Sequence, residues 1–385
     1  MTKKKSKIRA DFRKNRAQRA RHSDWTGDFV RHDPDDLDAV TRERIGKDET
    51  TRRRTVKGSP IDDEGDPGLG VYLEVDEEVC RRGRVLSVHG LASTVEDEHG
   101  RVYQCATRRL LKTLSTDQRH VVAAGDRVLF RPASGSRAAE GIIERIEPRQ
   151  RALCRSVRGR QQVIVANVDQ VLIVASVAEP RLKPNLIDRL LISTEKGRIR
   201  PVICLNKIDL VDPVSLQPLV GVYSRMGYQV LLLSAATGFG VDRLRRVLTG
   251  RETVVAGQSG VGKSSLLNAA DHKLRLRVAA VSEETQKGRH TTTTAQLFPL
   301  SFGGWVVDTP GIRQFELWDV VPAEVANYYR DLRPYVSLCR FPDCTHTHEA
   351  DCAVKNAVAD GRLDERRYES YCHLLAGEME SFDVW

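Results

Sequence analysis

The order of its short motifs is the feature that most constrains this chain. Asn206-Lys207-Ile208-Asp209 and Ser234-Ala235 come first, and the glycine-rich run GQSGVGKS at 257–264 follows them. A threonine cluster at 291–294 and Asp308-Thr309-Pro310-Gly311 come last. Proteins with these motifs ordinarily carry the glycine-rich run first and NKxD near the end. The same elements must therefore be connected here in a permuted order.

The region from about residue 162 alternates between strand and helix signals. Val171–Val177 and Pro201–Leu205 are continuous apolar runs of the kind buried in parallel sheets, and Leu186 to Leu191 mark a helix between them. Repeated β-α units predict a doubly wound sheet that binds ligands at the carboxyl ends of its strands. We therefore expect an α/β nucleotide-binding domain at 160–318.

The glycine-rich run has the spacing of a phosphate-binding loop after a β-branched strand and before a helix expected to reach Leu274. Its backbone N–H groups would face the β-phosphate, and Lys263 would reach the β- and γ-phosphates and assist catalysis. The predicted phosphate-binding residues are Gly257, Gln258, Ser259, Gly260, Val261, Gly262, Lys263, Ser264 and Ser265.

The NKID motif predicts which base is bound. The Asp209 carboxylate can accept hydrogen bonds from N1–H and the 2-amino group of guanine, a pattern that adenine does not offer. Asn206 would tie the loop to neighbouring backbone, Lys207 would cover the ring, and the amide of Ser234-Ala235 would meet the guanine oxygen. Together the motifs predict a GTPase and disfavour an ATP-dependent phosphate-loop enzyme.

The last two motifs predict the Mg²⁺ and γ-phosphate contacts. The Ser264 hydroxyl, Asp308 through water, and either Thr292 or Thr293 would complete the Mg²⁺ shell, and the Gly311 amide would meet the γ-phosphate.

Position 312 is Ile, where Ras-type enzymes have a Gln that orients the attacking water. His290 in the preceding loop is the candidate for this catalytic role, because an imidazole can hydrogen-bond water near neutral pH. The alternative is a loop histidine with no part in catalysis.

A cysteine cluster lies in the C-terminal part, 319–385, which we expect to be helical. Three thiolates and one imidazole make the closed ligand shell of a structural zinc site, and His348 is a rival to His346 as the fourth ligand. Cys372 lies on an apolar helical stripe and is interpreted as a buried structural thiol. The proposed ligands are Cys339, Cys344, His346 and Cys352.

Short strands with turn signals predict a small all-β barrel at 79–155. The pattern does not separate an OB-type barrel from an SH3-like one. Basic side chains in this part fit a nucleic-acid face or scattered surface charge equally well. The expected strands are Gly83–Val88, Ser93–Glu96, Val102–Ala106, Arg127–Arg131 and Gly141–Ile146.

The N-terminal extension, residues 1–78, carries the excess positive charge. Its first 21 residues hold ten Lys or Arg and one Asp. Their net charge of +9 equals that of the whole chain. Few aliphatic residues occur, so we expect a largely disordered segment. It is either an arm that binds nucleic-acid phosphates or a solvated charge run.

No apolar run approaches the length of a membrane span, and the basic start is not followed by an apolar segment as in a secretory signal. A cytoplasmic location with no membrane partner is therefore expected.

Taken together, these motifs resemble the RsgA (YjeQ) family of circularly permuted GTPases, which act in late assembly of the small ribosomal subunit. The resemblance covers about 80–385 and rests on the motif order, GRHTTT, DTPGIRQF and the spacing C-x4-C-x-H-x5-C. It implies an OB-fold domain, a central GTPase domain and a helical zinc-binding domain. It favours His346 as the fourth zinc ligand, and a catalytic histidine matching His290.

The resemblance also implies hydrolysis stimulated by the 30S subunit. We therefore expect a GTPase whose cycle controls docking on 16S rRNA, with GTP, Mg²⁺ and one structural Zn²⁺, acting as a monomer. The alternative is a constitutive rRNA-binding assembly factor in which GTP is structural.

Overall fold

The structure is a computed structural model that describes residues 7–12, 52–60, 71–113, 121–133, 139–157, 160–276, 295–308 and 324–376. It divides into two compact units. The first unit comprises the chain up to Ala152 together with Val157–Asn167, and the second comprises Leu153–Ser156 and the chain from Val168 on. Within the described ranges, no helix combines the length and the apolar character needed to cross a membrane.

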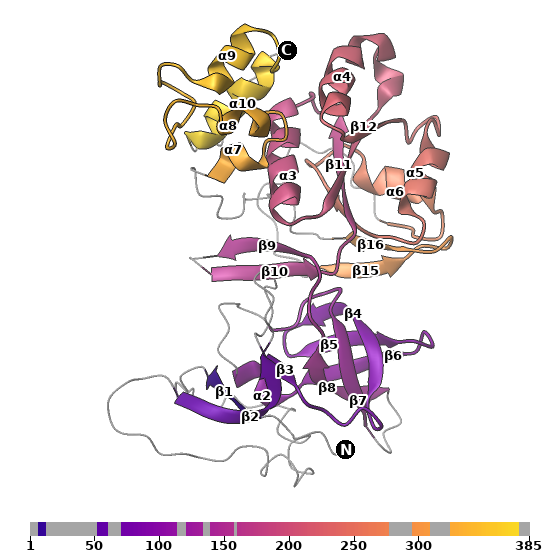
Figure 1. Cartoon of the computed structure of the whole chain (residues 1–385). Helices are drawn as coiled ribbons and strands as arrows, with labels where there is room; N and C mark the ends of the chain where they lie inside the picture. The colour runs from indigo at the N-terminus through magenta and orange to yellow at the C-terminus, as the bar shows by residue number, and fades with distance from the viewer. Residues whose placement is uncertain are drawn as a thin grey trace, which may run out of the picture. The chain divides into compact units, whose positions relative to one another are not determined.

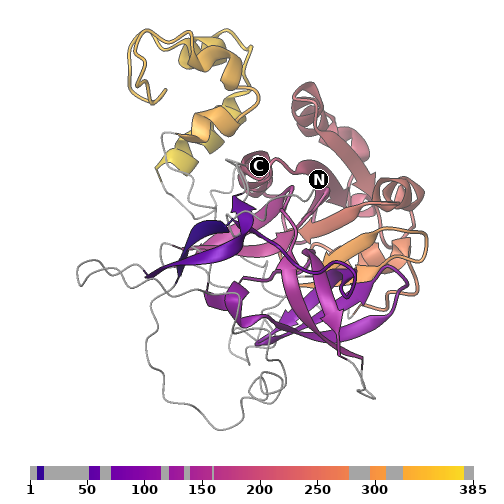
Figure 2. The same ribbon diagram turned by 60° about the horizontal axis from the view of Figure 1, so that its bottom comes forward.

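The first unit contains a closed barrel of five strands (Figures 1 and 2). The strands pair in the order β4-β5-β6-β8-β7, and β7 pairs back with β4. β6 and β8 run parallel, and the short helix α2 (Arg109–Thr113) follows β6. This arrangement is an OB-like barrel. The strands are β4 (Arg81–His89), β5 (Ala92–Asp97), β6 (Val102–Thr107), β7 (Arg127–Pro132) and β8 (Glu140–Ile146).

Alternation of side chains along the strands forms the barrel core. Val85, Val95 and Phe130 are fully buried, and Tyr103 packs against Phe130 with ring centroids 4.9 Å apart. Each of the five expected strands is found, and each is slightly longer than expected. The period-2 pattern was therefore sufficient to locate them.

Three strands also occur within the N-terminal extension. β1 (Lys7–Phe12), β2 (Arg52–Pro60) and β3 (Val71–Leu73) form an antiparallel sheet in that order. This differs from the predicted lack of order at these positions. Backbone N–H and C=O groups hold such a ladder and do not require the aliphatic side chains on which the prediction was based. Leu73 is buried in the barrel core, which therefore begins before residue 79.

The second unit is built on a six-stranded sheet with the order β13-β12-β11-β14-β16-β15. All neighbours are parallel except β15 and β16. The strands are β11 (Gln170–Ser176), β12 (Arg200–Asn206), β13 (Gln229–Leu233), β14 (Glu252–Ala256), β15 (Gln296–Pro299) and β16 (Trp305–Asp308). Two more strands, β9 (Ala152–Val157) and β10 (Arg160–Ala166), precede them.

In the described parts of this region, four α-helices connect the strands: α3 (Pro184–Lys196), α4 (Gln217–Arg225), α5 (Val241–Leu248) and α6 (Lys263–Ala270). Leucines of α5 and α6 share a core with β11 and β12. Helix α6 ends before the expected Leu274. The Asp271 carboxylate accepts hydrogen bonds from the backbone N–H of Lys273 (3.1 Å) and Ser301 (2.6 Å), which turns the chain out of the helix.

The C-terminal module, residues 324–376, has four short helices around its own apolar cluster (Figure 1, orange to yellow). Ile192 of α3 is the one buried residue of this cluster that comes from the sheet region. The helices are α7 (Val325–Tyr328), α8 (Arg333–Val336), α9 (Ala353–Ala359) and α10 (Glu365–Leu375).

Candidate functional site

Asn206 joins the two motifs that the sequence predicts to hold a nucleotide. It ends β12 and is 1% exposed. Its amide Nδ2 donates to the carbonyl of Val261 in the glycine-rich loop (2.8 Å), and its Oδ1 accepts from the backbone N–H of Ala235 (3.3 Å). One buried side chain therefore connects the NKID loop, the Ser234-Ala235 turn and the phosphate loop.

Asp209 and Lys207 are held in place by neighbouring groups. The Ser234 hydroxyl donates to the Asp209 carboxylate and accepts from the backbone N–H of Thr237 (3.1 Å). Lys207 adopts a left-handed conformation (φ 66°), and its ammonium donates to the carbonyl of Glu179. The contact with Glu179, which follows β11, was not predicted because main-chain acceptors leave no sequence signature.

The glycine-rich loop requires glycines for steric reasons. Gly257 has φ 143°, and a Cβ there would overlap the carbonyl of Val174 on β11. Gly262 has φ 91°, and a Cβ there would overlap the amide nitrogen of Asn206. The loop can thus pack against both β11 and Asn206 only while these positions lack side chains.

Lys263 begins α6 directly after this loop. Its ammonium donates to the carbonyls of Gly257 (2.8 Å) and Gln258 (2.7 Å), so its charge lies within the curve of the loop. Ser264 and Ser265 follow in the first turn of α6, where free backbone N–H groups and the helix dipole favour an anion. This donor set of backbone N–H groups, one ammonium and hydroxyls fits a phosphorylated ligand with Mg²⁺.

The remaining predicted residues of this site are not described. His290, Thr292, Thr293 and Gly311 lie outside the described residues. Of Asp308 only the backbone is described, at the end of β16, and β16 runs beside β14, the strand that leads into the glycine-rich loop.

The four candidate zinc ligands converge in the C-terminal module. The ligand atoms of Cys339, Cys344, His346 and Cys352 all lie within 4.8 Å of one another. The Sγ of Cys339 is 3.4 Å from His346 Nδ1 and 3.9 Å from Cys352 Sγ. A tetrahedral Zn²⁺ site needs four such atoms around one centre, so the donor set fits this ion.

His348, the rival fourth ligand, lies apart from the cluster. Its side chain is 82% exposed, and its Nδ1 contacts the Thr347 hydroxyl at 3.1 Å. His346 is 2% exposed, and burial lowers the pKa of its imidazole, which favours the neutral form that binds metals. Burial also raises the pKa of the Cys344 thiol to about 12, so metal binding there would release a proton.

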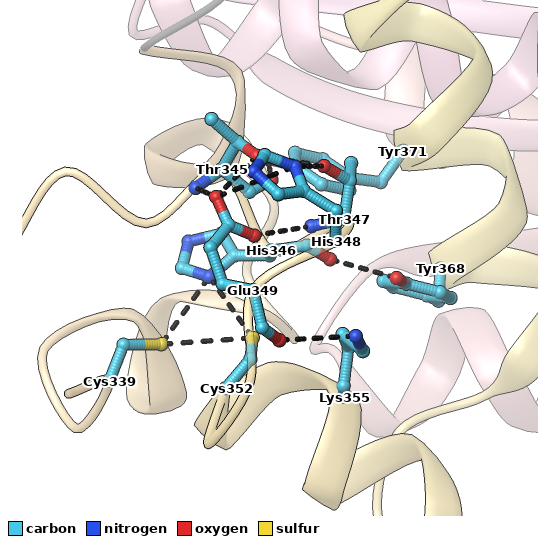
Figure 3. Close-up of polar contacts among 10 residues, drawn as sticks. All are labelled: Cys339, Thr345, His346, Thr347, His348, Glu349, Cys352, Lys355, Tyr368 and Tyr371. Carbon is cyan, nitrogen blue, oxygen red and sulfur yellow. Dashed lines mark hydrogen bonds and ion pairs between the residues drawn. The ribbon is translucent and has the colours of Figure 1, made fainter. Parts of the chain in front are cut away.

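The loop that carries these ligands is fixed by polar contacts (Figure 3). Glu349 accepts from the backbone N–H of Thr345 (2.6 Å) and of Thr347 (3.0 Å). Burial opposes ionisation of Glu349, but these hydrogen bonds outweigh it and lower the pKa of its carboxyl group. The resulting turn sets His346 at φ 60°.

Two tyrosine hydroxyls of α10 hold the same loop (Figure 3). Tyr368 donates to the carbonyl of His346 and Tyr371 to that of Thr345, both at 2.8 Å. Sequence analysis did not predict these hydroxyl contacts. Cys372 on the same helix is half-buried, and burial raises the pKa of its thiol.

This chain is similar in sequence and in fold to known proteins. Residues 146–318 match the family described as RsgA GTPase. A "Small ribosomal subunit biogenesis GTPase RsgA" from Sodalis glossinidius is 41% identical over 300 residues, covering 76% of this chain and 84% of the relative. A protein of the same name from Thermotoga petrophila is 42% identical over 299 residues, covering 77% of this chain and 96% of the relative.

Two solved structures also superimpose on the chain. YjeQ from Thermotoga maritima matches with a TM-score of 0.62 and 35% identity, over 79% of this chain and all of that protein (100%). YloQ, described as a circularly permuted GTPase, matches with a TM-score of 0.60 and 28% identity, over 80% of this chain and 97% of that protein.

Proposed function

Because this chain belongs to the RsgA family of GTPases and is a GTP hydrolase with the circularly permuted fold, we propose that it acts in late assembly of the small (30S) ribosomal subunit. The names of its relatives from Sodalis glossinidius and Thermotoga petrophila support this role. The subunit would stimulate hydrolysis, and the location would be the cytoplasm.

The observation that carries the nucleotide assignment is the hydrogen bond of Asn206 with Val261 (2.8 Å). This hydrogen bond links the predicted base-reading loop to the predicted phosphate loop, although these two motifs occur in permuted order along the chain. In our proposal Asp209 reads the guanine edge, Lys207 covers the ring, and the Ala235 amide contacts the guanine oxygen. Gly257 to Ser265 bind the phosphates.

Hydrolysis would use groups on both sides of the γ-phosphate. Lys263 would stabilise negative charge that develops on the β- and γ-phosphates. Ser264, Asp308 and Thr292 or Thr293 would hold Mg²⁺, which neutralises phosphate charge when bound. The Gly311 amide would contact the γ-phosphate. His290 would orient the attacking water, and a His290→Ala variant with an unchanged turnover rate would contradict this role.

The four-domain division and the zinc site belong to the same proposal. We place the extension at 1–78, with Leu73 contributing to the barrel core, the barrel at 79–155, the GTPase domain at 160–318 and the helical zinc-binding domain at 319–385. The convergence of Cys339, Cys344, His346 and Cys352 supports one structural Zn²⁺. The positive charge of the first 21 residues supports contact with 16S rRNA. In our proposal the protein acts as a monomer.

The test is GTP turnover measured with and without purified 30S subunits, with 50S subunits as the control. We expect 30S subunits to raise turnover by more than about tenfold, because a partner can complete a site that has Ile at position 312 in place of a water-orienting Gln. Equal turnover under all conditions would favour the alternative, an rRNA-binding assembly factor with structural GTP.

A further inference from the structure

One face of helix α3 is the docking surface for the C-terminal module. Asp188, Ile192 and Glu195 are spaced four and three residues apart, which places them on the same side of the helix. Asp188 is 0% exposed and Ile192 2% exposed. Ile192 is part of the module's apolar cluster, and the two carboxylates on either side of it bind arginines of the module.

Asp188 makes the buried part of this interface. Arg366 Nη1 donates a hydrogen bond to its carboxylate at 3.0 Å, and Arg367 Nη1 forms an ion pair with it at 2.7 Å, both from α10. The Tyr223 hydroxyl of α4 donates to it at 2.7 Å. Arg367, 1% exposed, also binds both oxygens of Asp331 at 2.9 and 3.0 Å. Charges this deeply buried are tolerated only while their partners stay aligned.

Glu195 makes the second ion pair two turns further along α3. Arg330 lies 2.6 Å from its carboxylate and 4.3 Å from the centre of the Tyr228 ring. Lys196 adds a more exposed pair with Glu324 at 3.7 Å. Ion pairs therefore attach the module to α3 in addition to the apolar contact of Ile192, and charged hydrogen bonds such as that of Arg366 depend on helix orientation more than apolar contacts do.

The next turn of α10 reaches the Cys/His cluster. Tyr368 and Tyr371 follow Arg367 by one and four residues, and their hydroxyls hold the carbonyls of His346 and Thr345. Tyr371 is 1% exposed and packs edge-on against Tyr329 with ring centroids 5.7 Å apart. A single helix of 11 residues therefore contacts both the metal-binding loop and α3.

We infer that α10 makes docking of the C-terminal module on α3 conditional on metal at the Cys/His cluster. A bound ion fixes loop 339–352, the loop fixes the two tyrosines, and the tyrosines fix the helix that presents Arg366 and Arg367 to Asp188. Removing the ion takes away the cross-link between the four ligands, and the arginine pairs then lose their alignment. This inference rests on the zinc site proposed above.

The test is hydrogen exchange of the full-length protein, measured with zinc bound and after removal of zinc by a chelator, with zinc content determined in parallel. We expect exchange within 184–196 to rise at least tenfold when zinc is removed. Exchange in β14, a central strand of the sheet, is expected to stay the same. Unchanged exchange in 184–196 after zinc removal would overturn the inference while leaving the zinc site intact.

A double variant, Tyr368→Phe with Tyr371→Phe, tests the route through α10. It keeps all four metal ligands, so we expect one zinc per chain together with raised exchange in 184–196. Tyr335→Phe is the matched control, because its hydroxyl has no hydrogen bond to any described residue. Wild-type exchange in the zinc-loaded double variant would show that α10 is not the link, and absence of zinc from the wild-type protein would overturn both proposals.

Discussion

Asn206 and Gly262 show how single residues bring the two halves of the nucleotide site together. The Asn206 amide occupies the space that a side chain at position 262 would need. The glycine is therefore required by a residue 56 positions earlier in the chain, in addition to its own φ of 91°. In the proposed nucleotide site, this close approach couples base reading to phosphate binding.

Gly262→Ala should weaken GTP binding by at least about tenfold, which corresponds to one displaced hydrogen bond of about 1.5 kcal/mol. Gly250→Ala is the matched control, because Gly250 also has a positive φ (68°) but a Cβ there meets no atom within 4 Å. Both variants should be destabilised by about 1–2 kcal/mol through backbone strain. Fluorescent GTP titration checks the difference, and equal affinities of the two variants would contradict the steric argument.

Asp209→Asn should exchange the base preference from guanine to xanthine. An Asn side chain keeps one acceptor and places an amide N–H donor opposite the other guanine N–H donor. One hydrogen bond of about 1.5 kcal/mol is lost, so GTP affinity should fall by at least about tenfold. XTP affinity should rise in the same variant. Competition binding with GTP, XTP and ATP measures this, and retained GTP affinity would refute the proposed role of Asp209.

At the scale of elements, α3 and α10 form a polar interface that the charge pattern of the sequence did not predict. Asp188 occurs in the apolar segment Leu186–Leu191, where a buried carboxylate needs a partner. That partner, Arg367, is 179 residues later. Burial opposes ionisation of Asp188, but the charges of Arg367 and Arg366 outweigh it and lower the pKa of its carboxyl group.

This lowered pKa predicts a decrease of stability in acid. A carboxyl group with a folded pKa below its unfolded value of about 4 stabilises the fold above that value, and the contribution disappears as pH falls through the folded pKa. Asp188→Asn should cost about 3 kcal/mol at pH 7 because it leaves buried arginines without a counter-charge. The difference from wild type should shrink below about pH 4.

Urea denaturation at pH 7 and at a series of lower pH values measures this effect. Asp242→Asn is the control, since Asp242 is 88% exposed and pairs with Arg245 only at the surface. We expect the control to change stability by less than about 0.5 kcal/mol. If the difference in free energy of unfolding between Asp188→Asn and wild type stayed constant across the acid range, the ion pairs of Asp188 with Arg366 and Arg367 would not be its cause.

At the scale of the whole molecule, the permuted order changes what the chain connects. The barrel precedes the base-reading strand β12, and the C-terminal module follows the strand β16. The module also rests on α3, which lies between β11 and β12 in sequence. It is therefore linked to the nucleotide-binding sheet both by the chain after β16 and by the ion pairs of α3.

Deleting residues 1–21 should weaken subunit binding mainly at low salt. Ten cations are removed with this segment, and the slope of log affinity against log salt should fall by about 1 for each phosphate that these cations neutralise. GTP affinity should not change. Sedimentation with 30S subunits between about 50 and 200 mM salt tests the arm, and an unaltered slope would identify the segment as a solvated charge run.

The local sequence determined the elements and the local chemistry. Period-2 and apolar patterns located the barrel strands, β11 and β12 within a few residues. Motif spacing indicated the phosphate loop and the four candidate metal ligands. These features depend on neighbours a few positions apart, so short windows of sequence contain them. Helix α6 was predicted too long because the hydrogen bond that ends it, between Asp271 and Ser301, joins residues remote in sequence.

Tertiary structure alone decided the closure of the barrel by the pairing of β7 with β4, the contact of Asn206 with the phosphate loop, and the packing of α10 on α3. Each of these joins residues far apart in the chain, and it depends on geometry that forms only when the elements pack. The permuted motif order predicted which parts are connected. The buried pairs of Asp188 with Arg366 and Arg367 decided where the C-terminal module is held, because ion pairs in the interior require both partners in place.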